Sequence, residues 1–123
     1  MLTLLLTDEN PGLQIFTNDG KWIDAPYKKG ALIVNVGDML ERWTNGLFKS
    51  TVHRVLSSGK SERYSIPFFY DPNFDTEVKC LDNCFDDETN PPKYPPTTSG
   101  KHLLDKYHAT HCDFKPLDDK NDG

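Results

Sequence analysis

Short runs of apolar residues, separated by turn-forming residues, fill the first 70 positions of the chain. The runs cover residues 2–6, 13–17, 21–25, 31–36, 51–56 and 62–70. Between the second and third runs, Asn18-Asp19-Gly20 is a tight-hairpin signal. Strands that recur about every ten residues predict an antiparallel β-sandwich or jelly roll. Residues 39–43 are long enough for only one helical turn between strands.

The pattern changes after residue 70. Pro91-Pro92 and Pro95-Pro96 oppose regular structure, so residues 71–96 are predicted to be extended. Leu103, Leu104 and Tyr107 then recur at helical spacing, which predicts a helix near residues 99–109 whose three apolar side chains pack on the sheet. We therefore divide the chain into a β domain, residues 1–75, and a C-terminal extension, residues 76–123.

Composition narrows the class of protein. The 123 residues suffice for one domain, and the net charge of -5 is concentrated in residues 71–123, which hold 12 acidic and 6 basic residues. With no basic stripe and no apolar run near the roughly 20 residues of a membrane helix, we expect neither nucleic acid nor a membrane as partner. Three cysteines and no readable secretory signal favour reduced thiols in the cytoplasm.

Candidate chemistry lies in the last two apolar runs. If these runs form a hairpin that is symmetric about Gly59, His53 lies opposite Ser65 and Val55 opposite Arg63. One face then combines an imidazole, which can bind a metal, with a guanidinium and a hydroxyl, which suit a carboxylate. The alternative is an exposed polar face, and a shift of register by one residue would break the alignment.

Short sequences in a fixed order carry a family resemblance. Among them are Val34-Asn35-Val36-Gly37-Asp38, Trp43-Thr44-Asn45-Gly46, His53-Arg54-Val55, Arg63-Tyr64-Ser65-Ile66-Pro67-Phe68-Phe69 and Pro92-Lys93-Tyr94. Together they resemble the C-terminal half of the catalytic domain of iron(II)- and 2-oxoglutarate-dependent oxygenases of the isopenicillin N synthase-like family. The resemblance implies a jelly roll, Fe(II) and 2-oxoglutarate as cofactors, and a dioxygenase that oxidises a small organic substrate.

The same resemblance assigns residues. His53 matches the distal iron ligand of the family's facial triad, while Arg63 and Ser65 match the Arg-x-Ser that holds the far carboxylate of 2-oxoglutarate. Two further positions match more loosely: Phe69 on the substrate side of the pocket, and Asn35, which either faces the site or stabilises a turn. The residues expected to exclude water are Leu4, Val55, Phe68 and Phe69.

The chain also departs from the family. Met1 falls on the middle position of the family's His-x-Asp motif, so two of the three iron ligands lie outside this sequence. We expect one of three origins for this sequence. It is a longer enzyme whose reading frame was started at an internal methionine, a longer enzyme whose gene model lacks upstream exons, or a short paralogue. The isolated chain is then inactive, and the alternative function is a non-catalytic β module that binds a protein or an organic acid. Uncovered strand edges and apolar faces predict self-association.

Substitutes for the missing ligands are few. Asp8 lies close in sequence to the missing strand, but the family also has a polar turn residue there. His108, His111 and Cys112 form a cluster without a fourth ligand at a recognised spacing, and Cys80 and Cys84 lack the second pair of a zinc ribbon.

Overall fold

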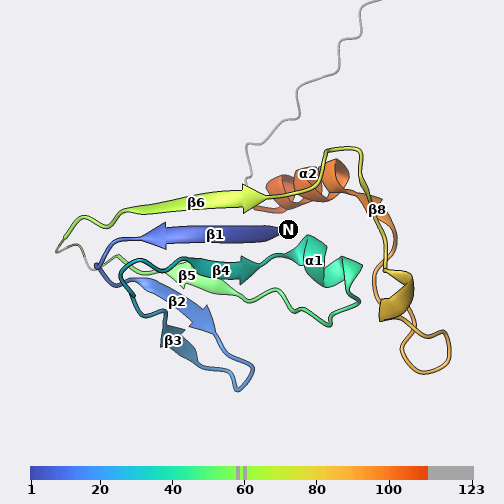
Figure 1. Ribbon diagram of the computed structural model, residues 1–123, viewed down its shortest axis with the longest axis horizontal. Helices are drawn as coiled ribbons and strands as arrows, with labels where there is room; N and C mark the ends of the chain where they lie inside the picture. Colours follow the sequence, from blue (N-terminus) through green and yellow to red (C-terminus); the bar gives the residue numbers. More distant parts are fainter. Residues whose placement is uncertain (58, 60, 111–123) are drawn as a thin grey trace, which may run out of the picture.

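Two small antiparallel sheets form the first 70 residues of the protein. The structure is a computed structural model that describes residues 1–57, 59 and 61–110. The first sheet has the strand order β4-β1-β6, with bounds Ile33–Val36, Leu2–Thr7 and Ser65–Tyr70. The second has the order β3-β2-β5, with bounds Trp22–Asp24, Leu13–Phe16 and His53–Val55 (Figure 1). All six strands lie within the predicted runs or extend them by one residue, and the mainly β fold is confirmed.

Strand β1 is the centre of the first sheet and fixes its two faces. It pairs with β4 on one edge and with β6 on the other, where Thr7 lies opposite Ser65. Side chains alternate along a strand, so Thr7, Ser65 and Ile33 share one face, and Leu4 lies on the other. Thr7 and Ile33 line a cavity together with Leu13 of β2. The first of these faces is therefore turned toward the second sheet.

The second sheet is built on the predicted hairpin. Gly20 adopts φ of +79°, which favours glycine, and its N–H donates to the carbonyl of Thr17 at 3.0 Å. This turn places Phe16 opposite Trp22, with ring centroids 5.0 Å apart. On the same face, the guanidinium of Arg54 lies 4.0 Å from the Trp22 ring centroid. This stacking joins β5 to the hairpin.

The predicted pairing of His53 with Ser65 is wrong. His53 lies opposite Ile15 in the second sheet, whereas Ser65 lies opposite Thr7 in the first. The connection between β5 and β6 thus crosses from one sheet to the other instead of closing a hairpin. The turn residues in the connection are compatible either with a hairpin or with a crossing between sheets. Which of the two forms depends on pairing with strands 40 to 60 residues earlier in the chain.

Helix α1, Asp38–Trp43, ends in a Schellman motif at Asn45 and Gly46. Asn45 is left-handed, with φ of +53°. The Gly46 N–H donates to the carbonyl of Glu41 at 2.8 Å, and that of Asn45 to Arg42 at 3.3 Å. Asn45 is 2% exposed. Asparagine is the non-glycine residue that best tolerates this conformation, and it also brings an amide group.

The amide of Asn45 binds the C-terminal extension. Its Nδ2 donates to the carbonyls of Asn90 at 3.3 Å and Pro91 at 3.1 Å, and its Oδ1 accepts the Lys93 N–H at 2.8 Å. The α1 side chains add two contacts, from Tyr94 Oη to the Glu41 carboxylate at 2.6 Å and from the Arg42 guanidinium to the carbonyl of Pro95 at 2.6 Å. Polar contacts with one short helix therefore hold the extended segment.

The described part of the extension, residues 76–110, contains β7 at Glu77–Val78, the 3-10 helix η1 at Asp82–Cys84, β8 at Thr97–Thr98, which pairs with β7, and helix α2 at Ser99–Thr110. Helices α1 and α2 gather at one end of the strands (Figure 1). No described residue belongs to a helix that could span a membrane.

Helix α2 is confirmed, and its first turn is its most buried part. Its start is buried at Ser99 and Gly100, and a Cβ at Gly100 would collide with the ring of Phe74. Leu103 and Tyr107 are each 42% exposed and Leu104 is half-buried. Packing of these three side chains on the sheet stays a prediction. The glycine allows Phe74 to approach the first turn closely, and further along the helix His102 and Lys106 lie 3.9 and 2.5 Å from Asp38 of α1.

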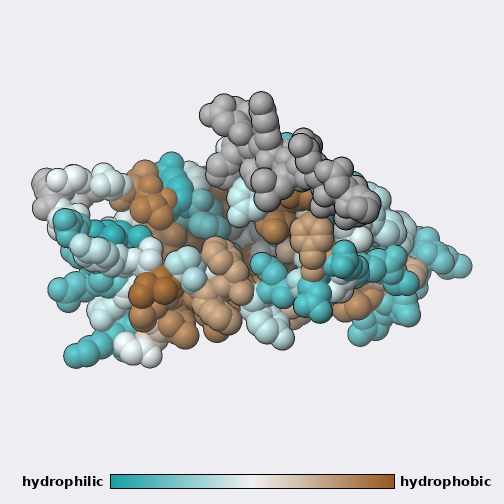
Figure 2. Space-filling model, turned by 90° about the horizontal axis from the view of Figure 1, so that it is seen from above, coloured by the Kyte–Doolittle hydropathy of each residue, from teal (hydrophilic) through white to brown (hydrophobic). Residues whose placement is uncertain are grey.

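Hydrophobic side chains remain exposed on both faces of β6. Phe68 is 61% and Phe69 is 66% exposed, although neighbouring residues in a strand point in opposite directions. Within the described residues no strand pairs with the outer edge of β6. Figure 2 shows hydrophobic groups at the surface in the middle of the molecule. Self-association through these surfaces stays a prediction.

Replacing Asn45 should weaken the attachment of the extension. Asn45→Gly keeps the left-handed backbone but leaves two carbonyls and one N–H without their partner, so we expect the free energy of unfolding to fall by about 2 kcal/mol or more. Chemical denaturation measures this change. Asn18→Gly in the exposed hairpin is the matched control and should change stability by less than about 0.5 kcal/mol. Equal effects of the two substitutions would contradict the proposed role of the amide.

The contact between α1 and α2 should make stability depend on pH. Burial lowers the pKa of His102, the positive charge of Arg42 lowers it further, and Asp38, 3.9 Å away, opposes both. A folded-state pKa below the unfolded value means that the contribution of His102 is complete above about pH 6.5 and is lost as the pH falls through the folded-state pKa.

We therefore expect the denaturation midpoint to fall between pH 7.5 and 5.5, and to fall less in His102→Gln. Lys106, 2.5 Å from Asp38, also faces this contact. An equal loss of stability in both proteins would show that other groups cause the pH dependence.

Candidate functional site

The imidazole of His53 has one ring nitrogen tied to the backbone and the other available to a ligand. Strand β5 exposes the side chain, and its Nδ1 lies 3.0 Å from the carbonyl oxygen of Thr51. A carbonyl only accepts hydrogen bonds, so in the neutral ring Nδ1 carries the proton and Nε2 keeps its lone pair. Such an outer hydrogen bond to a backbone carbonyl is common for histidines that bind metals.

Arg63 and Ser65 come together at the start of β6. The Nη1 atom of Arg63 donates to Ser65 Oγ at 3.3 Å. The Nε atom of Arg63 is buried and has no hydrogen-bond partner. Burying a donor without an acceptor is unfavourable by about 1 to 3 kcal/mol, which makes this guanidinium a candidate for binding an anionic ligand.

The side chain of Arg63 lies against the connection between β1 and β2. Gly12 in this connection has φ of +150°, and a Cβ there would lie 2.7 Å from the carbonyl oxygen of Leu56 and 3.3 Å from Cδ of Arg63. A cavity of about 110 Å³ opens beside Arg63, lined by residues 7–13, 24–27, 33 and 63. Only glycine at position 12 leaves room for both the arginine stem and the close approach of β5.

The predicted site residues are brought together only in part. Arg63 and Ser65 are in contact, but His53 belongs to the other sheet and is not part of the cavity beside Arg63. His53 and Val55 share the face of Leu13, which looks into that cavity. That His53 and Arg63 serve one site stays a prediction.

Of the residues predicted to exclude water, Val55 lies in the second sheet, and Leu4, Phe68 and Phe69 fall on both sides of the first. Phe69 and Asn35, each opposite Thr3, share the face of Ser65. Leu4 and Phe68, which lie opposite one another, are on the other face. The prediction that Leu4 and Phe68 shield this site is therefore wrong, because the side-chain period of two turns them away from it.

The other candidate ligands within the described part of the chain do not assemble into a metal centre. Among the described residues no three His, Cys, Asp or Glu side chains form a group that could hold a metal ion. His111 and Cys112 lie outside the described residues, so their predicted cluster with His108 stays untested. Cys80 and Cys84 are both free thiols.

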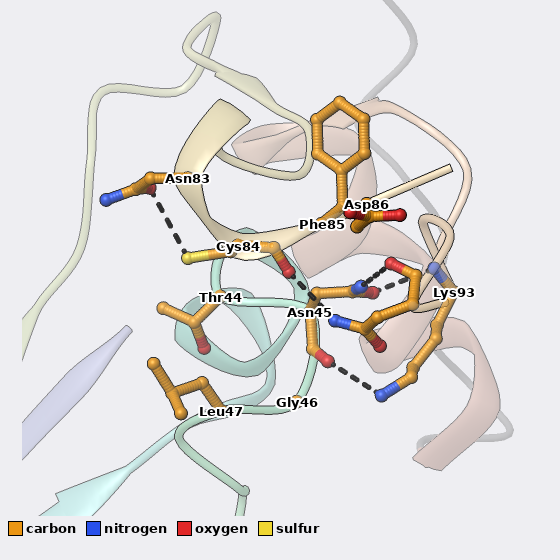
Figure 3. Close-up of a pocket in the computed structure, with 10 residues that line it drawn as sticks. Thr44, Asn45, Gly46, Leu47, Asn83, Cys84, Phe85, Asp86 and Lys93 are labelled. Carbon is orange, nitrogen blue, oxygen red and sulfur yellow. Dashed lines mark hydrogen bonds between the residues drawn. The ribbon is translucent and has the colours of Figure 1, made fainter. Parts of the chain in front are cut away.

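A larger cavity, of about 440 Å³, lies under the C-terminal extension (Figure 3). It is lined by residues 44–47, 83–86, 90 and 93. Its polar groups largely bind one another: the Asn45 amide binds the chain at residues 90 to 93, and Lys93 Nζ donates to the Asn45 carbonyl at 3.1 Å. The cavity includes none of the three predicted site residues, and its contacts are those that hold the extension.

Comparison with known proteins decides the family. The sequence profile of the 2OG-Fe(II) oxygenase superfamily matches residues 1–72, more than half of the chain. This chain belongs to that superfamily. The match ends within three residues of the predicted boundary of the β domain.

Named relatives of the superfamily agree with this assignment. The chain is 47% identical over 98 residues to the 2-oxoglutarate-Fe(II) type oxidoreductase hxnY of Emericella nidulans, covering 79% of this chain and 28% of the relative. It is 45% identical over 112 residues to azadirone synthase LFS of Melia azedarach, covering 88% and 33%. The chain thus spans about a third of the length of the curated relatives that it matches.

Solved structures of the superfamily share the fold. Full-length Neurospora crassa T7H in complex with alpha-KG and thymine superposes with a TM-score of 0.79 and 38% identity, covering 89% of this chain and 34% of that one. JOX2 in complex with 2OG, Fe and JA gives a TM-score of 0.78 and 38% identity, covering 84% and 30%. The jelly-roll prediction is confirmed.

Sequence reasoning missed two features of this site. Gly12, which the sequence pattern did not single out for a role in this site, makes room for Arg63. Asp8, considered only as a substitute iron ligand, accepts the N–H groups of Tyr64 at 2.6 Å and Asn10 at 3.0 Å. The available signal was the spacing Asp8-x-Asn10, because aspartate readily binds the N–H two residues further on.

Proposed function

We propose that this chain forms the part of an Fe(II)- and 2-oxoglutarate-dependent dioxygenase site that binds the far carboxylate of 2-oxoglutarate and supplies one iron ligand. Arg63 and Ser65 hold the carboxylate, and His53 binds the iron through Nε2. The whole enzyme oxidises a small organic substrate. When bound, iron supplies the redox chemistry that couples this oxidation to decarboxylation of 2-oxoglutarate.

The buried, unpartnered Nε of Arg63 is the observation that supports this proposal most strongly. A carboxylate placed beside it would accept from Nε and from one terminal nitrogen, while Ser65 Oγ, 3.3 Å from Nη1, offers a further donor. Arginine keeps its charge at any physiological pH and presents a planar pair of donors, which lysine cannot do. An organic acid with a carboxylate that reaches this guanidinium is therefore the ligand that suits it.

The iron site is only partly provided by the described residues. His53 has a suitable free nitrogen, but no other described side chain joins it to form a group of three ligands. This favours, as second candidate, a β module that binds an organic acid without catalysis. Both candidates need Arg63, and they differ in whether iron and turnover are involved.

Substitution of Arg63 should specifically damage cosubstrate binding. The test protein is a chimaera in which this chain replaces the matching segment of hxnY. Arg63→Ala leaves a carboxylate unpaired, which typically weakens binding by about 3 kcal/mol or more, or roughly 100-fold in the apparent KM for 2-oxoglutarate. Ser65→Ala should raise it about fivefold, for about 1 kcal/mol.

Arg54→Ala is the matched control for this experiment. Arg54 also lies in the wall of the β domain, but its guanidinium binds Gln14 and Trp22 on the outer face. Its loss should leave the KM for 2-oxoglutarate within about twofold. Equal KM values for Arg63→Ala and Arg54→Ala would show that Arg63 is not the carboxylate anchor.

The 123-residue chain alone should bind ferrous iron weakly, because a single imidazole must compete with water at the other coordination positions. Anaerobic calorimetric titration should give a dissociation constant well above 1 µM, with any binding abolished by His53→Ala. A one-to-one complex of sub-micromolar affinity would contradict this prediction and show that the chain completes a metal site by itself.

A further inference from the structure

Asp8 begins the connection between β1 and β2, at the end of the strands opposite the helices (Figure 1). Its N–H donates to the carbonyl of Tyr64 at 3.1 Å and so extends the ladder of β1 and β6 by one residue. In a regular pair the Tyr64 N–H would return this bond to the carbonyl of Asp8. Instead the Asp8 carboxylate accepts it, at 2.6 Å. The side chain thus completes the ladder while the backbone turns away.

The same carboxylate is also linked, by hydrogen bonds through Asn10, to the residue that precedes Arg63. It accepts the Asn10 N–H at 3.0 Å and the Asn10 Nδ2 at 3.2 Å, and that Nδ2 also donates to the carbonyl of Glu62 at 2.9 Å. Glu62 and Tyr64 are the two neighbours of Arg63 in the chain. The backbone of Arg63 is therefore held on both sides by one three-residue segment.

This connection also shapes the space of the Arg63 side chain. Gly12, four residues after Asp8, leaves room for the arginine stem, and its carbonyl accepts the Leu56 N–H at 2.9 Å. Both Asp8 and Arg63 line the cavity of about 110 Å³. The segment that fixes the backbone of Arg63 thus also forms a wall for its guanidinium.

From this geometry we propose that Asp8 is a positioning residue for Arg63 and thereby sets the affinity for 2-oxoglutarate. We do not assign Asp8 as an iron ligand, because both of its carboxylate oxygens already accept N–H groups. The effect on affinity rests on the proposed function of Arg63, whereas the effect on the position of Arg63 does not. Asp8 acts through the arginine and touches no reacting group.

The chain offers a direct measurement of this role. It contains only three arginines, Arg42, Arg54 and Arg63, so their three Nε–H signals are separable by NMR in the 123-residue protein. The Nε atoms of Arg42 and Arg63 are both buried without partners, and both N–H groups should exchange slowly with water. Arg42, in α1, is then an internal control for the overall stability of the fold.

In Asp8→Ala we expect the Arg63 Nε–H to exchange at least tenfold faster while Arg42 is unchanged. The dissociation constant for 2-oxoglutarate, from NMR titration, should rise about tenfold. Asp19→Ala, which removes a hairpin carboxylate paired with Lys21 at 3.1 Å, should change neither quantity. If Asp8→Ala fails to fold, Asp8→Asn provides the test. Its single amide oxygen cannot accept all of these N–H groups, so this variant should show smaller changes in the same exchange rate and dissociation constant.

Two results would overturn the proposal: an unchanged Arg63 signal in the Asp8 variants, or equal acceleration at Arg42 and Arg63, which indicates general loosening. If the wild-type chain binds 2-oxoglutarate no more tightly than Arg63→Ala, the proposed function fails instead. The exchange rates still decide the role of Asp8 in that case.

Discussion

Pairing of β1 with β6 is the constraint on which the rest of the site depends. The two strands are separated by almost 60 residues, and their six-residue register places Thr7 opposite Ser65. This pairing brings the start of β6 against the connection that follows β1. Arg63, Ser65, Asp8 and Gly12 become neighbours for this reason alone, so a local guanidinium site is built from two distant pieces of sequence.

A second group of contacts, most of them polar, holds the C-terminal extension against α1 and the turn that follows it. The described residues that are buried and hydrophobic are few, namely Leu13, Met39, Val78 and Cys80. Because so little apolar surface is removed from water, the amide of Asn45 and the side chains of α1 determine where the extension lies. The larger cavity is a consequence of this arrangement and is lined by the same hydrogen-bonded groups.

Exposed aromatic residues on both faces of β6 fit a chain that spans about a third of the length of its relatives. A strand rich in Phe and Ile is stable in water when its faces are covered, and here the second sheet covers only part of one face. Function in the superfamily therefore has to be tested where this surface is covered, and the chimaera with hxnY provides that setting.

The sequence by itself determined the six strands of the β domain, the hairpin at Gly20, the position of helix α2 and the chemical types of the site residues, because each depends on side chains close together in the chain. Only the tertiary structure decided which strands pair. The hairpin predicted to pair His53 with Ser65 was consistent with the local sequence, but β5 and β6 belong to different sheets. The sheet that each strand joins depends on pairing with strands far away in the sequence. Likewise, the hydrogen bond between Asp8 and Tyr64 and the close approach of Phe74 to Gly100 each join residues that are distant in the sequence. Local patterns specify conformation, whereas contacts between distant segments are selected by the packing of the whole chain.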